Sequence, residues 1–183
     1  MRWQQLFADL EAQLEAEEDR ELALEVADRT RRERALVGVP ERLLGHRGRT
    51  LQLRLLGGQV LDGEVVDVGL DWCLLAETVG RSALVPTSAF LTLSGLTGAA
   101  TTGSVATMAR RFGFGHAARG LSRDRAVVAL ADVGGSTVTG TIDAVGADAL
   151  ELSEHAVDLP RRPENVLARC VLPFAAIASV RTT

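Results

Sequence analysis

Hydrophobic and polar residues alternate in two stretches of the chain, at about residues 48–94 and 125–181. In the first stretch, Leu51, Leu53 and Leu55 are separated by Gln52 and Arg54, which is the period of two expected for a strand with one buried face. The glycine pair at 57–58 then gives a hairpin-turn signal. Each stretch predicts five strands, at 51–55, 60–68, 70–76, 82–85 and 90–93, and at 126–131, 137–145, 149–153, 166–172 and 177–181.

The second stretch repeats the first. With an offset of 77 positions, nine of the 25 residues from Leu53 to Glu77 are identical to those from Leu130 to Glu154, and four of the nine are glycines. Glycines mark turns and bends that a fold must keep. The offset then becomes 87, so that Val85-Pro86 aligns with Leu172-Pro173. We interpret the pattern as a unit of helix plus small β-barrel that was copied once, with ten extra residues in one loop of the second copy.

The first 36 residues have a different pattern. Residues 2–36 predict one long helix, because Ala, Leu, Glu and Arg dominate and neither Gly nor Pro occurs before Gly38. Leu22 and Val26 begin a second apolar stripe on this helix. The first stripe needs a covering surface, which can be the chain's own barrels, a second copy of the chain or a foreign partner. Its residues, which are candidates for self-association into a homo-oligomer, are Trp3, Leu6, Phe7, Leu10 and Leu14.

Together these patterns predict a mainly β fold with helices (α+β), in which two tandem five-stranded barrels follow a long N-terminal helix. Shorter helices at 40–46 and within 104–121 are expected to precede each barrel. The predicted organisation is a helix at 1–38, a first helix-plus-barrel repeat at 39–94, a linker at 95–103 and a second repeat at 104–183.

Several residues recur at matched places in the two stretches of short bent strands: Gly63-x-Val65, Gly140-x-Ile142, Asp71, Asp148 and Leu172-Pro173-Phe174-x-x-Ile177. With these residues and a one-turn break before the last strand, the stretches resemble the Sm-like small barrels. They also resemble the Src-homology-3-like barrel at the C-terminal end of the ribosome maturation factor family. The resemblance covers about 105 residues and implies the barrel fold. The distance from Gly63 to Asp71 is too long for the Sm RNA site, and Asn165 lies in a loop, so no uridine-binding residue is inferred.

Charge is distributed in blocks along the chain, although the total is −4. Residues 1–28 carry nine acidic residues against two arginines, whereas residues 29–54 carry eight arginines against two acidic residues. A third block, 110–125, carries five arginines against one acidic residue. Such asymmetry points to charged partners more than the net charge does.

No enzyme chemistry is recognisable. The two cysteines, Cys73 and Cys170, are far apart and lack a CxxC pair, which argues against a disulfide framework or a structural zinc site. The three histidines have no ligand spacing and are expected at the surface, and Asp71 and Asp148 are expected in hairpin turns. We therefore expect no catalytic residue, cofactor, metal or small-molecule substrate. Without a signal peptide or membrane span, a cytoplasmic location is expected.

The third charged block is the best candidate for nucleic-acid contact, because arginines interleaved with aromatic rings can grip phosphates and stack on bases. The alternative is that Phe112 and Phe114 cap the second barrel while the arginines remain solvated. The acidic chain, with a pI near 5.4, argues against a dedicated nucleic-acid domain. The candidate contact residues are Arg110, Arg111, Phe112, Phe114, Arg119 and Arg123.

The sequence thus favours a non-catalytic interaction or assembly module, since small barrels often bind partners or each other through exposed strand edges. The alternative is an RNA-binding module that uses the segment 110–125. In either case a binding site is expected at the junction between the repeats or at the helices that precede them.

Overall fold

The computed structural model describes residues 2–78, 80–101 and 111–182, and within these ranges it leaves out the side chains of residues 2–6, 8–16, 18 and 78. The chain divides into two compact units, Met1–Gly38 and Val39–Thr183. Each unit is described by itself.

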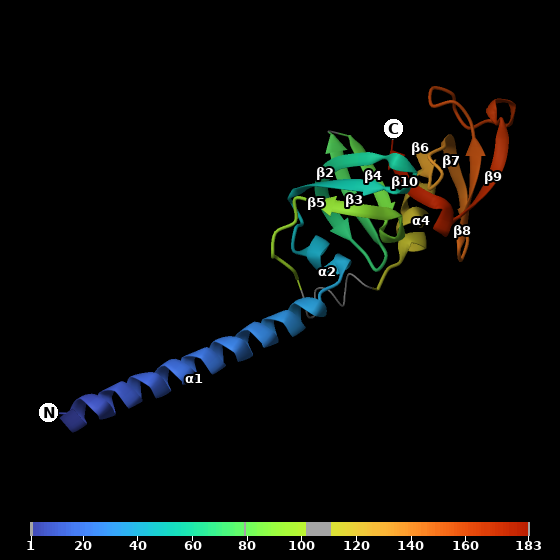
Figure 1. The fold of residues 1–183 in the computed structure, drawn as a ribbon. Coiled ribbons are helices and arrows are strands. Elements are labelled where there is room, and N and C mark those ends of the chain that lie inside the picture. Colours follow the sequence, from blue (N-terminus) through green and yellow to red (C-terminus); the bar gives the residue numbers. More distant parts are fainter. Residues whose placement is uncertain (1, 79, 102–110, 183) are drawn as a thin grey trace. The chain divides into compact units, whose positions relative to one another are not determined.

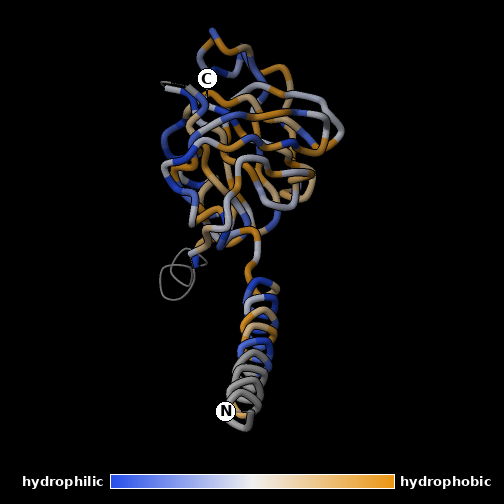
Figure 2. The backbone as a smooth tube through the Cα atoms, turned by 60° about the vertical axis from the view of Figure 1, so that its left-hand side comes forward, coloured by the Kyte–Doolittle hydropathy of each residue, from blue (hydrophilic) through white to orange (hydrophobic). Residues whose placement is uncertain are grey.

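The first unit is helix α1 (Arg2–Ala35), which confirms the prediction of a long helix. Three of its arginines are paired with acidic residues of the same helix: Arg29 with Glu33, and Arg31 and Arg32 with Asp28. Leu22, Leu24 and Val26 are exposed and form an apolar band on an otherwise hydrophilic stretch (Figure 2). Because the ion pairs are exposed, each stabilises the helix by only a few tenths of a kcal/mol.

The second unit is built on one antiparallel sheet, which contains ten strands among the described residues (Figure 1). Their order is β5-β1-β2-β3-β4-β10-β6-β7-β8-β9, so the first five strands and the last five follow the same order. The mainly β fold with helices is therefore confirmed. The strands are β1 (Thr50–Leu55), β2 (Val60–Val68), β3 (Trp72–Thr78), β4 (Arg81–Pro86), β5 (Phe90–Ser94), β6 (Val127–Asp132), β7 (Thr137–Val145), β8 (Ala149–Glu154), β9 (Ala168–Pro173) and β10 (Ile177–Thr182).

The two halves of the sheet also share local details. A one-residue bulge falls at Val66 in β2 and at Asp143 in β7, where the pairing register with the next strand shifts. The carbonyl of Asp71 accepts a hydrogen bond from the N–H of Thr87, and the carbonyl of Asp148 accepts one from the N–H of Phe174. The sequence offsets of 77 and 87 therefore also match the strands, and we call residues at matched positions counterparts.

Two strands begin two residues later than predicted. β3 begins at Trp72 because Leu70 and Asp71 lie in the preceding turn, where the N–H of Gly69 donates to the carbonyl of Trp72. β9 begins at Ala168 because a 3₁₀ turn (Pro163–Asn165) comes before it.

Inward-facing leucines make the first of two core clusters. Leu51, Leu53 and Leu55 of β1 are buried, as their alternation predicts, and the short helix α2 (Val39–Leu44) adds Leu43 and Leu44. Each fully buried leucine contributes about 2 kcal/mol of hydrophobic stabilisation.

The second cluster crosses from one half of the sheet to the other. Helix α4 (Phe114–Asp124) packs on β7 and contributes Phe114, while Trp72 of β3 and Leu84 of β4 join it from the first half. The helix begins where the carboxylate of Asp71 accepts a hydrogen bond of 2.6 Å from the N–H of Phe114. This contact suits the positive end of the helix dipole.

Two of the three histidines are buried, which corrects the expectation that all lie at the surface. His46 donates from Nδ1 to the carbonyl of Arg42 (2.6 Å) and accepts at Nε2 from the N–H of Thr97 (2.8 Å). His155 lies between the carbonyl of Ala156 and the hydroxyl of Thr141, at 2.8 Å from each. A carbonyl can only accept, so Nδ1 is the donor in both rings. Both histidines have structural roles.

Candidate functional site

Of the five side chains in the first apolar stripe of α1, the structure describes that of Phe7. Phe7 is 59% exposed, whereas the side chains of Trp3, Leu6, Leu10 and Leu14 lie outside the described residues. Self-association through this stripe stays a prediction.

The candidate nucleic-acid segment, residues 110–125, is described except for Arg110. Arg110 lies outside the described residues, and Arg111, Arg119 and Arg123 are exposed. Arg119 donates a hydrogen bond of 3.1 Å to the carbonyl of Gly146, which ties one of these arginines to the turn between β7 and β8.

The two phenylalanines of this segment have different surroundings. Phe112 is about half exposed and stacks on His116, with ring centroids 4.3 Å apart. Phe114 is 2% exposed and contacts Phe174 edge-on at 5.3 Å. Phe114 is therefore a core residue with no free ring face, which corrects its place among the candidate base contacts. RNA binding by the remaining residues stays a prediction.

The structure brings together a different set of residues, at the joint between β4 and β10. These strands pair antiparallel, with Leu84 opposite Val180 and Ala83 opposite Arg181. Leu84 is 3% exposed and Val180 1%. The joint therefore continues the sheet from one half to the other and buries apolar side chains as it does so.

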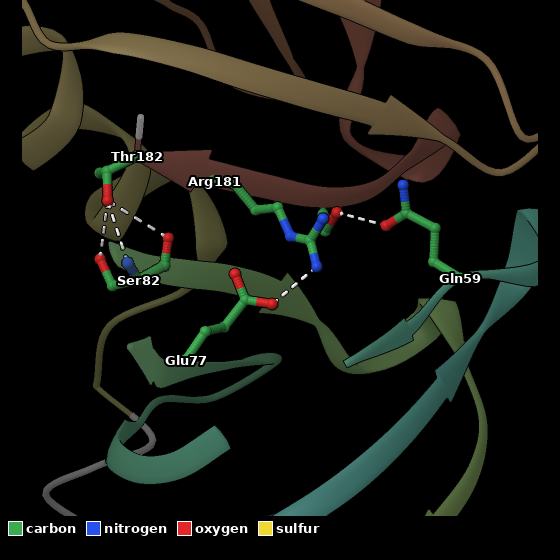
Figure 3. Close-up of polar contacts among 6 residues, drawn as sticks. Gln59, Glu77, Ser82, Arg181 and Thr182 are labelled. Carbon is green, nitrogen blue, oxygen red and sulfur yellow. Dashed lines mark hydrogen bonds and ion pairs between the residues drawn. The ribbon is translucent and has the colours of Figure 1, made fainter. Parts of the chain in front are cut away.

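Polar contacts reinforce the joint on both sides (Figure 3). Arg181 donates to Glu77 at 2.6 Å, and the N–H of Ser82 donates to the hydroxyl of Thr182 at 3.0 Å. Farther along β10, the hydroxyl of Ser179 donates to the side-chain oxygen of Gln59 at 2.9 Å. Because Glu77 is 16% exposed and Arg181 36%, this ion pair is partly shielded from water and stronger than a fully exposed pair.

The turn between β1 and β2 and the turn between β6 and β7 approach each other closely at glycines. Gly57 has φ +79°, and a Cβ placed on it would lie 2.8 Å from the carbonyl oxygen of Asp132 and 2.8 Å from the amide nitrogen of Gly135. Both the backbone angle and the lack of space require glycine at position 57.

The outermost strands of the sheet, β5 and β9, each pair on one side in the described structure. Leu91 of β5 is 55% exposed, whereas its counterpart in β10, Ala178, is fully buried. Val171 of β9 is 70% exposed, whereas its counterpart, Leu84, is buried. The two outermost strands therefore carry exposed apolar residues at positions whose counterparts in β4 and β10 are buried. Unpaired strand edges of this kind are templates for another strand.

The sequence did not point to these edge residues. Their alternation predicts strands but is the same in paired and unpaired strands. The usable signal was the predicted repeat, because two copies of one unit would leave two equivalent pairs of edges, of which a single pair could be joined within the chain.

Other chemistry is limited among the described residues. No group of three or more His, Cys, Asp or Glu side chains there is placed to hold a metal ion, and none of the described helices is long and apolar enough to cross a membrane. Burial raises the pKa of the Cys73 thiol to about 12, so this cysteine stays protonated and unreactive at neutral pH.

Comparisons of the chain with protein-family models, curated proteins and solved structures gave no match.

Proposed function

We propose that this protein is a non-catalytic assembly module built from two copies of an Sm-like barrel unit, and that it associates head to tail through β9 of one molecule and β5 of the next. The observation behind the proposal is the contrast between Leu84, buried at the β4–β10 joint, and its counterpart Val171, exposed at the free edge. The contact between molecules would repeat the contact within the molecule.

This proposal specifies a register. Because Leu84 lies opposite Val180 and Ala83 opposite Arg181, offsets of 87 place Leu93 of one molecule opposite Val171 of the next, and Ser94 opposite Cys170. The contact joins two different surfaces, so it can propagate into a ring or a filament rather than close as a two-fold dimer.

The contact between molecules should be weaker than the internal joint. The apolar pair is kept as Val171 and Leu93, but Arg181 is replaced at the free edge by Ser94, so the ion pair with an acidic residue of the third strand is lost. Glu151 also stands where the first half has Leu74, which packs against the second core cluster. We therefore expect reversible association that depends on protein concentration.

The register can be tested with a single substitution. In Ser94→Cys, the introduced thiol would lie opposite the native Cys170 of a neighbouring molecule, within the separation that a disulfide spans. Mild oxidation of the full chain should give a ladder of linked oligomers on a non-reducing gel, because each molecule offers one thiol at each edge. Burial protects Cys73 from this reaction.

Thr92→Cys is the matched control, since Thr92 is exposed on the same strand but two residues out of register. It should form few links. Equal ladders from both variants would indicate random collision, and no ladder from Ser94→Cys would refute the register. Sedimentation of the unmodified chain should show association that Val171→Asp abolishes and Phe7→Glu leaves unchanged. The opposite result would assign association to α1.

A further inference from the structure

A cavity of about 480 Å³ lies against the second half of the sheet, between β7, β8, β9 and the end of α4. This volume is within the range of small-molecule sites. The charged residues that line the cavity are Arg125, Asp143, Glu151, Arg161 and Arg169, and Ser122 and Thr141 are hydroxyl-bearing residues of the lining.

Arg125 is held in an unfavourable backbone conformation at this cavity. It ends α4 with φ +49°, and it is the one residue other than glycine with a positive φ among the described residues. Its counterpart in the first half is Gly48, with φ +77°, which is the residue that such a position normally takes. The arginine side chain makes no hydrogen bond or ion pair with the described part of the chain. The backbone conformation belongs to the helix end, but glycine would adopt it without strain, so the second half carries an arginine side chain here that the fold does not require.

Asp143 fixes a second arginine in the wall of the cavity. As the bulge residue of β7 it is turned out of the regular pairing, as bulges near functional sites often do. Its carboxylate contacts Arg161 Nε at 2.5 Å and accepts a hydrogen bond of 2.5 Å from the hydroxyl of Ser153. These contacts, with that of Arg161 the larger, lower the pKa of Asp143. Asp143 is therefore ionised and already occupied, and it positions the Arg161 guanidinium.

The cavity has an excess of positive charge that the first half of the sheet lacks. The lining carries three arginines, Arg125, Arg161 and Arg169, against two carboxylates. Asp143 interacts most strongly with Arg161 and also with Arg169, which leaves Glu151 as the second acidic residue of the lining. The first-half counterparts of these charged residues are uncharged: Gly48 for Arg125, Val66 for Asp143, Leu74 for Glu151 and Ser82 for Arg169. Arg161 lies in the loop that is longer in the second half. The charges are thus specific to this cavity and are not a general property of the fold.

We infer that the cavity binds a small phosphorylated molecule, with Arg125 and Arg169 holding the phosphate and Glu151 accepting a hydrogen bond from a hydroxyl or amino group of the ligand. Planar guanidinium groups match phosphate oxygens in pairs, and an acidic residue in the lining besides Asp143 suits a ligand that also carries donors. This inference revises the expectation that no small molecule binds, and it does not depend on the assembly proposal.

Calorimetric titration of the full chain with ribose 5-phosphate, ribose and a ten-residue single-stranded RNA tests the ligand class. Binding of ribose 5-phosphate but not of ribose supports the inference. Binding of RNA alone would overturn it in favour of a polymer backbone as the source of phosphate, and binding of none of the three would also overturn it.

Substitutions test the site. Arg125→Gly and Arg169→Ser each introduce the residue found at the counterpart position in the first half of the sheet. Each substitution should weaken the binding of ribose 5-phosphate at least tenfold. Arg125→Gly should also raise Tm, because glycine relieves the backbone strain. Arg123→Gln is the matched control, since Arg123 is exposed at the same helix end but outside the lining, and it should bind normally. Undiminished binding in either cavity variant, or an equal loss in the control, would overturn the inference.

Discussion

The β4–β10 joint makes a quantitative prediction that compares two matched positions. Leu84→Ala removes a side chain that is 3% exposed in the cluster between the two halves of the sheet. Truncation of a fully buried leucine costs about 3–5 kcal/mol in free energy of unfolding, because apolar transfer is lost and a cavity remains. Val171→Ala removes methyl groups at the counterpart position, where the side chain is 70% exposed, and should cost less than about 0.5 kcal/mol.

Urea unfolding followed by tryptophan fluorescence measures this difference. The chain has two tryptophans, and Trp72 lies in the same cluster as Leu84, so Trp3→Phe in every variant leaves one reporter beside the substitution. With a urea m-value of about 2 kcal/mol/M, Leu84→Ala should lower the midpoint by about 1.5 M or more. The Val171→Ala midpoint should stay within about 0.25 M of the parent. Similar losses in the two variants would refute the burial of β4 against the second half, and so would a loss below about 1 kcal/mol in Leu84→Ala.

Three further predictions follow from the hairpins, the Asp143 carboxylate and the free edge. Gly57→Ala should destabilise the fold by about 1–3 kcal/mol more than Gly58→Ala in chemical unfolding, because both positions have positive φ but only the first has backbone atoms within 4 Å of a new Cβ; equal losses would contradict the close approach. Because Arg161 lowers the pKa of Asp143, the ionised carboxylate stabilises the folded state above the unfolded-state pKa of about 4, and this contribution is lost as the pH falls through the lower folded-state pKa. The unsubstituted protein should therefore exceed Asp143→Asn in free energy of unfolding by a margin that shrinks as the pH falls below about 5. A margin in urea unfolding that stays constant with pH would refute this role of Asp143. Val171 lines the cavity and also lies on the free edge, so saturating ribose 5-phosphate should reduce association measured by sedimentation, and an unchanged mass would show that the two sites are independent.

The sequence alone determined the local structure. The alternation at Leu51, Leu53 and Leu55 placed a strand with its buried face correctly, and the absence of Gly and Pro before Gly38 placed the long helix. Such patterns suffice because strand and helix periodicity depends on neighbours a few residues away. Where turn chemistry competed, as at Leu70 and Asp71, the predicted strand boundary was wrong by two residues.

Only the tertiary structure decided which of these elements meet. Leu84 and Val171 occupy matched strands with similar sequence patterns, yet one is buried and the other exposed, because β10 reaches β4 from about 100 residues away. For the same reason sequence spacing did not distinguish Phe114, which is in the core, from Phe112, which is not. Arg125 was one arginine in a charged block until its backbone angle and its place in the cavity set it apart. Burial, edge pairing and strain are non-local properties, and a period read along the chain contains no information about which distant strand will cover a given face.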